Sequence, residues 1–177
     1  MDLQSIYTAF FASTYTQADA RRRLNILDIV VEDATYKTGV EKTMQQLLSE
    51  KTMSDSDRKI LTDFLKSVKL PANTQDIKKM FIGLKEEILK RPVVTLTLAF
   101  EPTPEQILSY GEWFRKNVNP RSLLTIVFSA AVVGGCSITW QGKQVTYDLE
   151  YLLKAKRNEI LAVVDKYVAI KSKEKII

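Results

Sequence analysis

The sequence predicts an α+β protein, with an N-terminal helix bundle in residues 1–90 and a small mixed β-sheet with two helices in residues 91–177. Two observations lead to this prediction. Apolar residues recur at helical spacing from residue 2 to residue 90. After Arg91-Pro92 the pattern changes to a two-residue alternation, which is typical of strands. The predicted order in the second half is β-α-β-β-β-α, and its first crossover is expected to be right-handed.

In the helical half, caps and breakers indicate where helices begin and end. Ser54 stands before an apolar periodic run and is a suitable N-cap. Leu70-Pro71 should end that helix, because proline disfavours a helical residue before it. A further helix should begin near Thr74. The residues expected to face inward are Leu24, Leu27, Ile29, Val30, Val31, Ile60, Leu61, Phe64, Leu65, Val68, Ile77, Met80, Phe81, Leu84, Ile88 and Leu89.

The second half alternates between strand and helix patterns. Residues 94–100 should form a strand with one apolar face, and Thr103-Pro104 should open a helix as N-cap and first residue. The near-continuous apolar run of residues 123–128 predicts a central strand. A long last helix should begin near Leu149. The residues expected to face inward are Val94, Leu96, Leu98, Phe100, Ile107, Leu108, Tyr110, Gly111, Trp113, Phe114, Leu152, Leu153, Ile160, Val163, Val164, Tyr167 and Val168.

Three glycines are predicted to serve turns. Gly134-Gly135 stands between two strands without the flanking pattern of a phosphate-binding loop, so tight backbone geometry explains the pair better than ligand binding. Gly142 lies in Gln141-Gly142-Lys143, a short connection typical of a hairpin. These three positions are therefore interpreted as structural turns.

The composition removes most classes of catalytic site. The 177 residues include no histidine and one cysteine, Cys136, which excludes Ser-His-Asp and Cys-His arrangements and most zinc sites. Cys136 begins an apolar alternating run and is expected to be a buried small side chain. No P-loop or dinucleotide fingerprint occurs. We therefore expect no catalytic residue, no cofactor and no metal site.

The sequence also indicates a compartment. A single cysteine cannot form an internal disulfide, which favours a reducing environment. Met1-Asp2-Leu3-Gln4 lacks the basic start and apolar run of a signal peptide, and no apolar stretch reaches the length of about 18 residues that spans a bilayer. A cytoplasmic protein is expected.

The first predicted helix is rich in aromatic residues. Ile6, Tyr7, Phe10 and Phe11, with Tyr15 after them, give this helix more aromatic surface than a small bundle obviously needs. Core packing is one interpretation. The other is that Ile6, Tyr7, Phe10 and Phe11 bind a partner, in a groove that receives an amphipathic helix from another chain.

Several motifs of the second half occur in a fixed order. Glu105-Gln106 lies on the short helix, Val132-Val133-Gly134-Gly135 leads into the hairpin, and Asp148 precedes the terminal helix. In this order the chain resembles the delta subunit of the F-type ATP synthase, the family of the oligomycin-sensitivity-conferring protein, most closely over residues 93–155. At the other end, the segment from Tyr7 to Ala12 is similar to the opening of the family's first helix.

The resemblance implies a non-catalytic peripheral-stalk (stator) subunit. Such a subunit links the N-terminal helices of the alpha subunits in the catalytic head to the b-subunit stalk, and it resists rotor torque during proton-driven ATP synthesis. Its place would be peripheral to the inner face of the cell membrane. Two alternatives stay open. One is a small basic nucleic-acid-binding adaptor, which would use Arg21–Arg23 and a lysine-rich tail, given the net charge of +5. The other is an enzyme that works through carboxylates and lysines alone.

Overall fold

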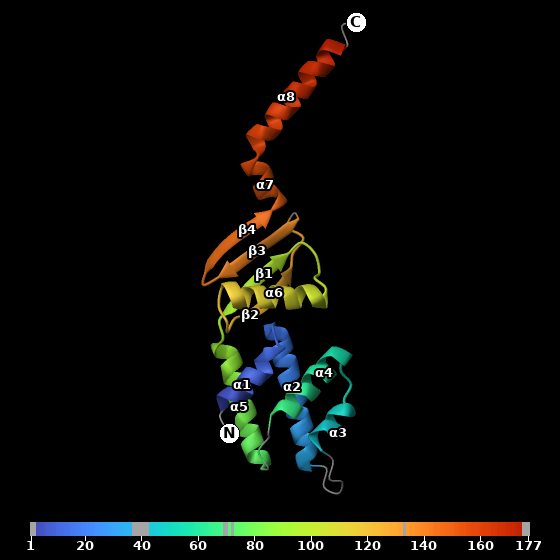
Figure 1. Cartoon of the computed structure of the whole chain (residues 1–177), viewed down its shortest axis with the longest axis vertical. Coiled ribbons are helices and arrows are strands. Elements are labelled where there is room, and N and C mark those ends of the chain that lie inside the picture. Colours follow the sequence, from blue (N-terminus) through green and yellow to red (C-terminus); the bar gives the residue numbers. More distant parts are fainter. Residues whose placement is uncertain (1–2, 37–42, 69–70, 72, 133, 175–177) are drawn as a thin grey trace. The chain divides into compact units, whose positions relative to one another are not determined.

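The structure is a computed structural model that describes residues 3–36, 43–68, 71, 73–132 and 134–174. Its fold is α+β, with a helical N-terminal region and a four-stranded mixed sheet, as the sequence predicts. Figure 1 shows the elements in chain order. They are α1 (Leu3–Ala12), α2 (Gln17–Tyr36), α3 (Met44–Ser49), α4 (Asp55–Ser67), α5 (Thr74–Lys90), β1 (Val93–Leu98), α6 (Pro104–Asn117), β2 (Leu123–Phe128), β3 (Gly135–Trp140), β4 (Lys143–Asp148), α7 (Leu149–Ala155) and α8 (Arg157–Glu174).

The chain divides into two compact units. The helical unit comprises Met1–Val94 and Thr103–Thr125, and the sheet unit comprises Thr95–Pro102 and Ile126–Ile177. The division does not follow a single cut after residue 90, because α6 and the beginning of β2 belong to the helical unit.

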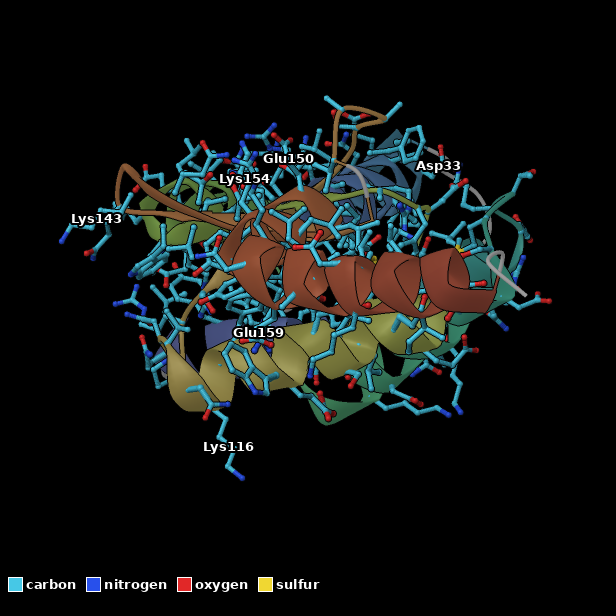
Figure 2. All side chains as sticks on the ribbon, turned by 90° about the horizontal axis from the view of Figure 1, so that it is seen from above. Asp33, Lys116, Lys143, Glu150, Lys154 and Glu159 are labelled. Atoms are coloured by element: carbon cyan, nitrogen blue, oxygen red, sulfur yellow. The ribbon has the colours of Figure 1, made fainter. Side chains whose placement is uncertain are left out.

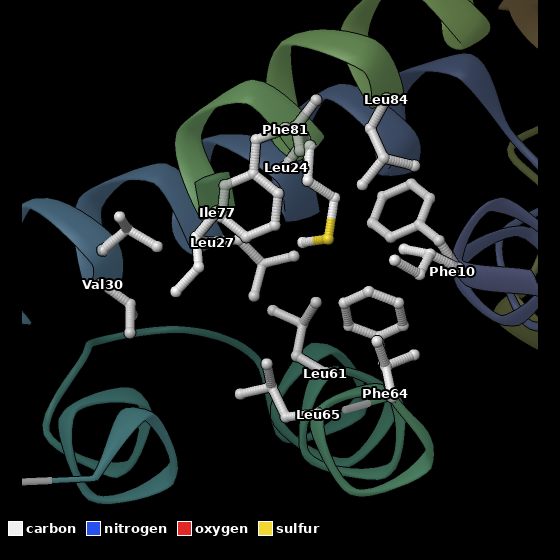
Figure 3. Packing of buried hydrophobic residues seen from close by; sticks show 14 of the residues in the cluster. Phe10, Leu24, Leu27, Val30, Leu61, Phe64, Leu65, Ile77, Phe81 and Leu84 are labelled. Atoms are coloured by element: carbon white, nitrogen blue, oxygen red, sulfur yellow. The ribbon is translucent and has the colours of Figure 1, made fainter. Parts of the chain in front are cut away.

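Side chains from α1, α2, α4 and α5 form one core in the helical unit (Figure 3). The ring of Phe10 meets the ring of Phe64 edge to face, with centroids 5.6 Å apart. Full burial of an aliphatic or phenylalanine side chain contributes about 1.5–3 kcal/mol, so this core supplies most of the unit's stability. The predicted inward residues are buried here, except that Ile60 is half-buried and Ile29 and Leu89 are exposed.

The predicted helix starts agree with the structure. The Ser54 hydroxyl accepts a hydrogen bond from the Asp57 amide at 3.1 Å. Thr103 caps α6, and Gln106 completes a capping box by accepting from the Thr103 amide at 2.8 Å. Helix α4 ends at Ser67, and Leu70 lies outside the described residues.

The sheet has the strand order β2-β1-β3-β4. β1 runs antiparallel to β3, with Leu96 opposite Ile138, and β3 runs antiparallel to β4. The β3–β4 hairpin turns through Gln141 and Gly142, whose φ angles are 50° and 75°. Two positive φ angles define the two-residue turn whose twist matches the flanking strands, which explains the glycine at 142.

The prediction that residues 123–128 form a central strand is wrong, because β2 lies at an edge of the sheet. Its apolar run has another cause. Leu123 and Leu124 are buried, and the Leu124 amide donates to the Tyr15 carbonyl at 2.8 Å, whereas Val127 and Phe128 are exposed. The start of β2 is apolar because it packs within the helical unit.

The prediction of one packed C-terminal helix is also wrong. The segment forms two helices, α7 and α8, and the side chains expected to pack inward are exposed. In both halves the apolar period marks a helix correctly, but it does not show whether the chain itself covers the apolar face. Further residues that were expected inside but are exposed are Phe100, Leu108 and Trp113.

Candidate functional site

Exposed apolar side chains are concentrated on α8. At 100° per residue they occupy one half of the helix, whereas Ala162, Asp165 and Lys166 project from the other half. The exposed fractions of Val163 and Tyr167 are 67% and 62%. We call this surface the apolar α8 face, and it consists of Ile160, Leu161, Val163, Val164, Tyr167, Val168 and Ile170.

The surface continues onto α7. Leu149 and Leu153, together with Arg157, line a shallow hollow of about 580 Å³. Glu150 and Lys154 border the same hollow and form an ion pair of 2.6 Å, and Figure 2 labels both side chains. A hydrophobic centre with a charged rim is typical of a protein-binding surface.

Most of the residues predicted to bind a partner on α1 are buried. Ile6, Phe10 and Phe11 lie in the core of the helical unit, with exposed fractions of only 2–3%. Tyr7 is half-buried, and its hydroxyl lies where a Cβ at Gly83 would have to stand, so α1 packs closely against α5. A partner could contact Tyr7 without rearrangement, but not the other three side chains.

Among the described residues of α1 and α5, three large apolar side chains are exposed. Leu3 projects from α1, and Ile82 and Leu89 project from α5. Ile82 and Leu89 are seven residues apart and so share one face of their helix. These positions, more than the predicted ones, are available to a partner on this unit.

A buried charge cluster links α2 to the start of α4. Asp57 accepts hydrogen bonds of 2.8 Å from Nε of Arg22 and from Nε of Arg23. Burial would raise the pKa of Asp57, but hydrogen bonds from Arg22, Arg23 and Ser54 outweigh this effect and lower the pKa to about 2. Arg23 also donates to the Ser13 carbonyl at 2.8 Å. The carboxylate therefore stays ionised and holds both arginines.

Sequence reasoning missed this cluster. The run Arg21–Arg23 was considered above only as a contact for nucleic acid, yet Arg23 is buried. The one available signal was Asp57 as the third residue after the cap Ser54, a position where carboxylates commonly serve the helix start. Nothing in the local pattern connects Asp57 with arginines more than thirty positions earlier.

The predicted turn glycines have the expected backbone angles. Gly134 and Gly135 have φ angles of 66° and 109°, in the region that favours glycine. The Gly134 carbonyl accepts from the Leu149 amide at 3.0 Å, which fixes the start of α7. Cys136 is half-buried, and burial raises the pKa of its thiol, which disfavours a nucleophilic thiolate.

Within the described residues, no group of acidic or cysteine side chains is arranged to hold a metal ion. In the same ranges, no helix combines the length and the apolar character needed to cross a bilayer. Comparison with models of known protein families and with curated proteins finds no match to this chain.

Proposed function

We propose that this chain is a non-catalytic stator subunit similar to the delta subunit of the F-type ATP synthase. It links the alpha-subunit N-termini of the catalytic head to the b-subunit stalk and resists rotor torque during ATP synthesis. Its place in the cell is then the cytoplasmic side, peripheral to the inner face of the membrane. It reaches the membrane only through the complex and needs no cofactor.

The observation that supports this proposal most is the apolar α8 face. Seven exposed aliphatic and aromatic side chains on one half of a helix cost free energy in water, so this face favours association. An amphipathic helix of another chain can cover such a stripe through residues spaced three and four apart. The helices α7 and α8 would supply such a surface to the stalk.

The helical unit offers exposed side chains for the proposed contact with the N-terminal helices of the alpha subunits. Leu3, Ile82 and Leu89 are exposed apolar side chains on α1 and α5, and the half-buried Tyr7 of α1 contacts α5 at Gly83. This arrangement suits a short helix from the head better than it suits a rigid pocket for a small substrate.

Two of the residues that the nucleic-acid alternative would use are engaged within the fold. Arg22 and Arg23 donate hydrogen bonds to Asp57, so their charges are already compensated within the fold. A phosphate would therefore have to compete with Asp19 and Asp57 for the charge of these two side chains.

The decisive experiment uses membranes that contain the whole synthase. Val163→Asp places a carboxylate in the apolar α8 face, whereas Ala162→Asp places the same group on the polar half of α8. We expect Val163→Asp to keep ATP hydrolysis by the head but to reduce ATP-driven proton pumping several-fold. Ala162→Asp should behave as wild type.

A second readout is co-purification of the alpha and b subunits with the tagged chain. Wild-type protein that never associates with either subunit would contradict the proposal, as would equal coupling in the two variants. Phe10→Asp and Phe11→Asp are unsuitable for this purpose, because both side chains are buried and their replacement would damage the core.

A further inference from the structure

A cavity of about 320 Å³ lies within the helical unit, between α2, the start of α4 and the first turns of α6. Its apolar wall consists of Tyr15, Ile60, Pro104, Ile107 and Leu108. The volume falls in the range of small-molecule sites, about 300–1,000 Å³, and such sites combine an apolar wall with a few polar groups. The proposed stator function does not use this cavity.

The charges in the cavity are balanced. Arg22, Arg23, Asp19 and Asp57 all line it, which gives two guanidinium groups and two carboxylates. Arg22 Nη2 donates to Asp19 at 2.6 Å, and Asp57 accepts from both arginines. A charged ligand would leave one uncompensated charge in a partly dehydrated site, which is costly. The balance therefore favours a neutral ligand.

Hydrogen-bond donors remain for such a ligand. Arg22 uses Nε and Nη2 for the carboxylates, and among the described residues no acceptor faces its Nη1. The Arg22 side chain is about half exposed, so Nη1 can be reached. Ser13 and Ser56 line the same cavity. A carbonyl oxygen of the ligand would accept a hydrogen bond from the Arg22 guanidinium. A hydrogen bond from a charged donor is stronger than one between neutral groups.

We propose that this cavity binds a small neutral amphiphile, with its apolar body against Ile60, Ile107 and Leu108 and a carbonyl head group against Arg22. Amides and esters of medium chain length have this chemistry. Binding would leave the Arg22–Asp57–Arg23 cluster intact, because only the spare nitrogen of Arg22 is used.

The test is an NMR titration of the full chain, labelled with ¹⁵N, using three probes that share one alkyl chain. The probes are hexanamide, hexanoate and hexylammonium. We expect hexanamide to shift the amide signals of Tyr15, Ile60 and Leu108, and to bind at least about fivefold more tightly than either ion, as the loss of about 1 kcal/mol implies. Equal affinities for the three probes would overturn the proposal, as would signal changes confined to α7 and α8.

Two matched variants test the location. Leu108→Glu places a carboxylate at the apolar wall, and Leu89→Glu makes the same change on α5, away from the cavity; both leucines are exposed, so the fold should tolerate the changes. Hexanamide affinity should fall at least about tenfold for Leu108→Glu, because a charge replaces apolar contact. It should not change for Leu89→Glu. An unchanged affinity in Leu108→Glu contradicts the proposal, and if that variant unfolds, the probe series decides. No partner subunit is present, so the result is independent of the stator function.

Discussion

The guanidinium of Arg115 lies over the ring of Tyr15, with Cζ 4.4 Å from the ring centroid. The same side chain donates to the Phe11 carbonyl at 2.7 Å and to the Thr14 carbonyl at 2.5 Å. Carbonyls at a helix C-terminus lack partners inside the helix, so Arg115 supplies donors that the end of α1 needs. A residue of α6 thus fixes the turn between α1 and α2.

Replacing Arg115 by alanine should therefore destabilise the helical unit. Three hydrogen bonds from a charged donor are lost, of which the longest joins Nε to the Ser122 carbonyl at 3.4 Å, together with a cation–π contact. We expect the free energy of unfolding to fall by about 3 kcal/mol. The measurement is urea unfolding followed by circular dichroism. Lys116→Ala is the control, because the Lys116 side chain is exposed (Figure 2) and should change stability by less than about 0.5 kcal/mol. Equal effects of the two changes would refute this role of Arg115.

The Arg22–Asp57–Arg23 cluster predicts a loss of stability in acid. The pKa of Asp57 is about 2 in the folded protein and 3.8 ordinarily, so the folded state binds this proton less readily than the unfolded state does. A lowered folded-state pKa gives stability that is present above about pH 4 and lost as the pH falls towards 2. The full contribution is about 2 kcal/mol, from 1.36 kcal/mol per pKa unit.

This contribution is measured by urea unfolding between pH 6 and pH 2 in three proteins. Asp57→Asn should lower stability at pH 6 and flatten the acid dependence, since it removes the carboxylate whose pKa is lowered by folding. Asp55→Asn removes an exposed carboxylate from the same helical turn and should keep the wild-type slope. A wild-type slope in Asp57→Asn would show that other carboxylates account for the acid dependence.

The sequence predicts the elements well where the cause is local. The caps at Ser54 and Thr103 and the alternation of β1 depend on neighbouring residues, and each is found in the structure. The turn at Gly142 depends on a positive φ angle, which its neighbour Gln141 shares.

The sequence fails where an apolar residue could be covered by more than one partner. Leu123 and Leu124 are apolar because the helical unit buries them, not because β2 is central. The α8 residues have the period of a packed helix, yet no local pattern distinguishes a face covered by the same chain from one covered by another chain. Arg115 and its carbonyl acceptors are about a hundred positions apart, beyond any periodicity argument.

Two glycines on helices of the helical unit should respond differently to alanine. A Cβ at Gly111 would overlap the Tyr15 ring near its attachment point, and the Arg115 guanidinium lies over the same ring. A Cβ at Gly83 would meet only the hydroxyl end of Tyr7, which is half-buried and can shift. The cost of each alanine therefore depends on whether the tyrosine atoms next to it can move.

We expect Gly111→Ala to destabilise the protein by about 1–3 kcal/mol, the usual cost of overpacking. Gly83→Ala should be neutral or should stabilise by up to about 1 kcal/mol, because alanine is the better helix former. Thermal unfolding of the two variants beside wild type measures the difference. A more damaging Gly83→Ala would show that Tyr7 is held more firmly than Tyr15.

Substitutions in the apolar α8 face should leave the stability of the isolated chain nearly unchanged. Val163→Asp changes a side chain that is 67% exposed, so the free energy of unfolding of the isolated chain should change by less than about 0.5 kcal/mol. Val30→Asp makes the same chemical change at a fully buried position of α2 and should cost several kcal/mol or prevent folding, because a carboxylate without a partner enters the core. Urea unfolding of both variants gives the comparison, with circular dichroism to verify the helix content of Val163→Asp. If Val163→Asp destabilises the isolated chain as Val30→Asp does, then the chain itself covers this face, and the main argument for a partner helix on α8 no longer holds.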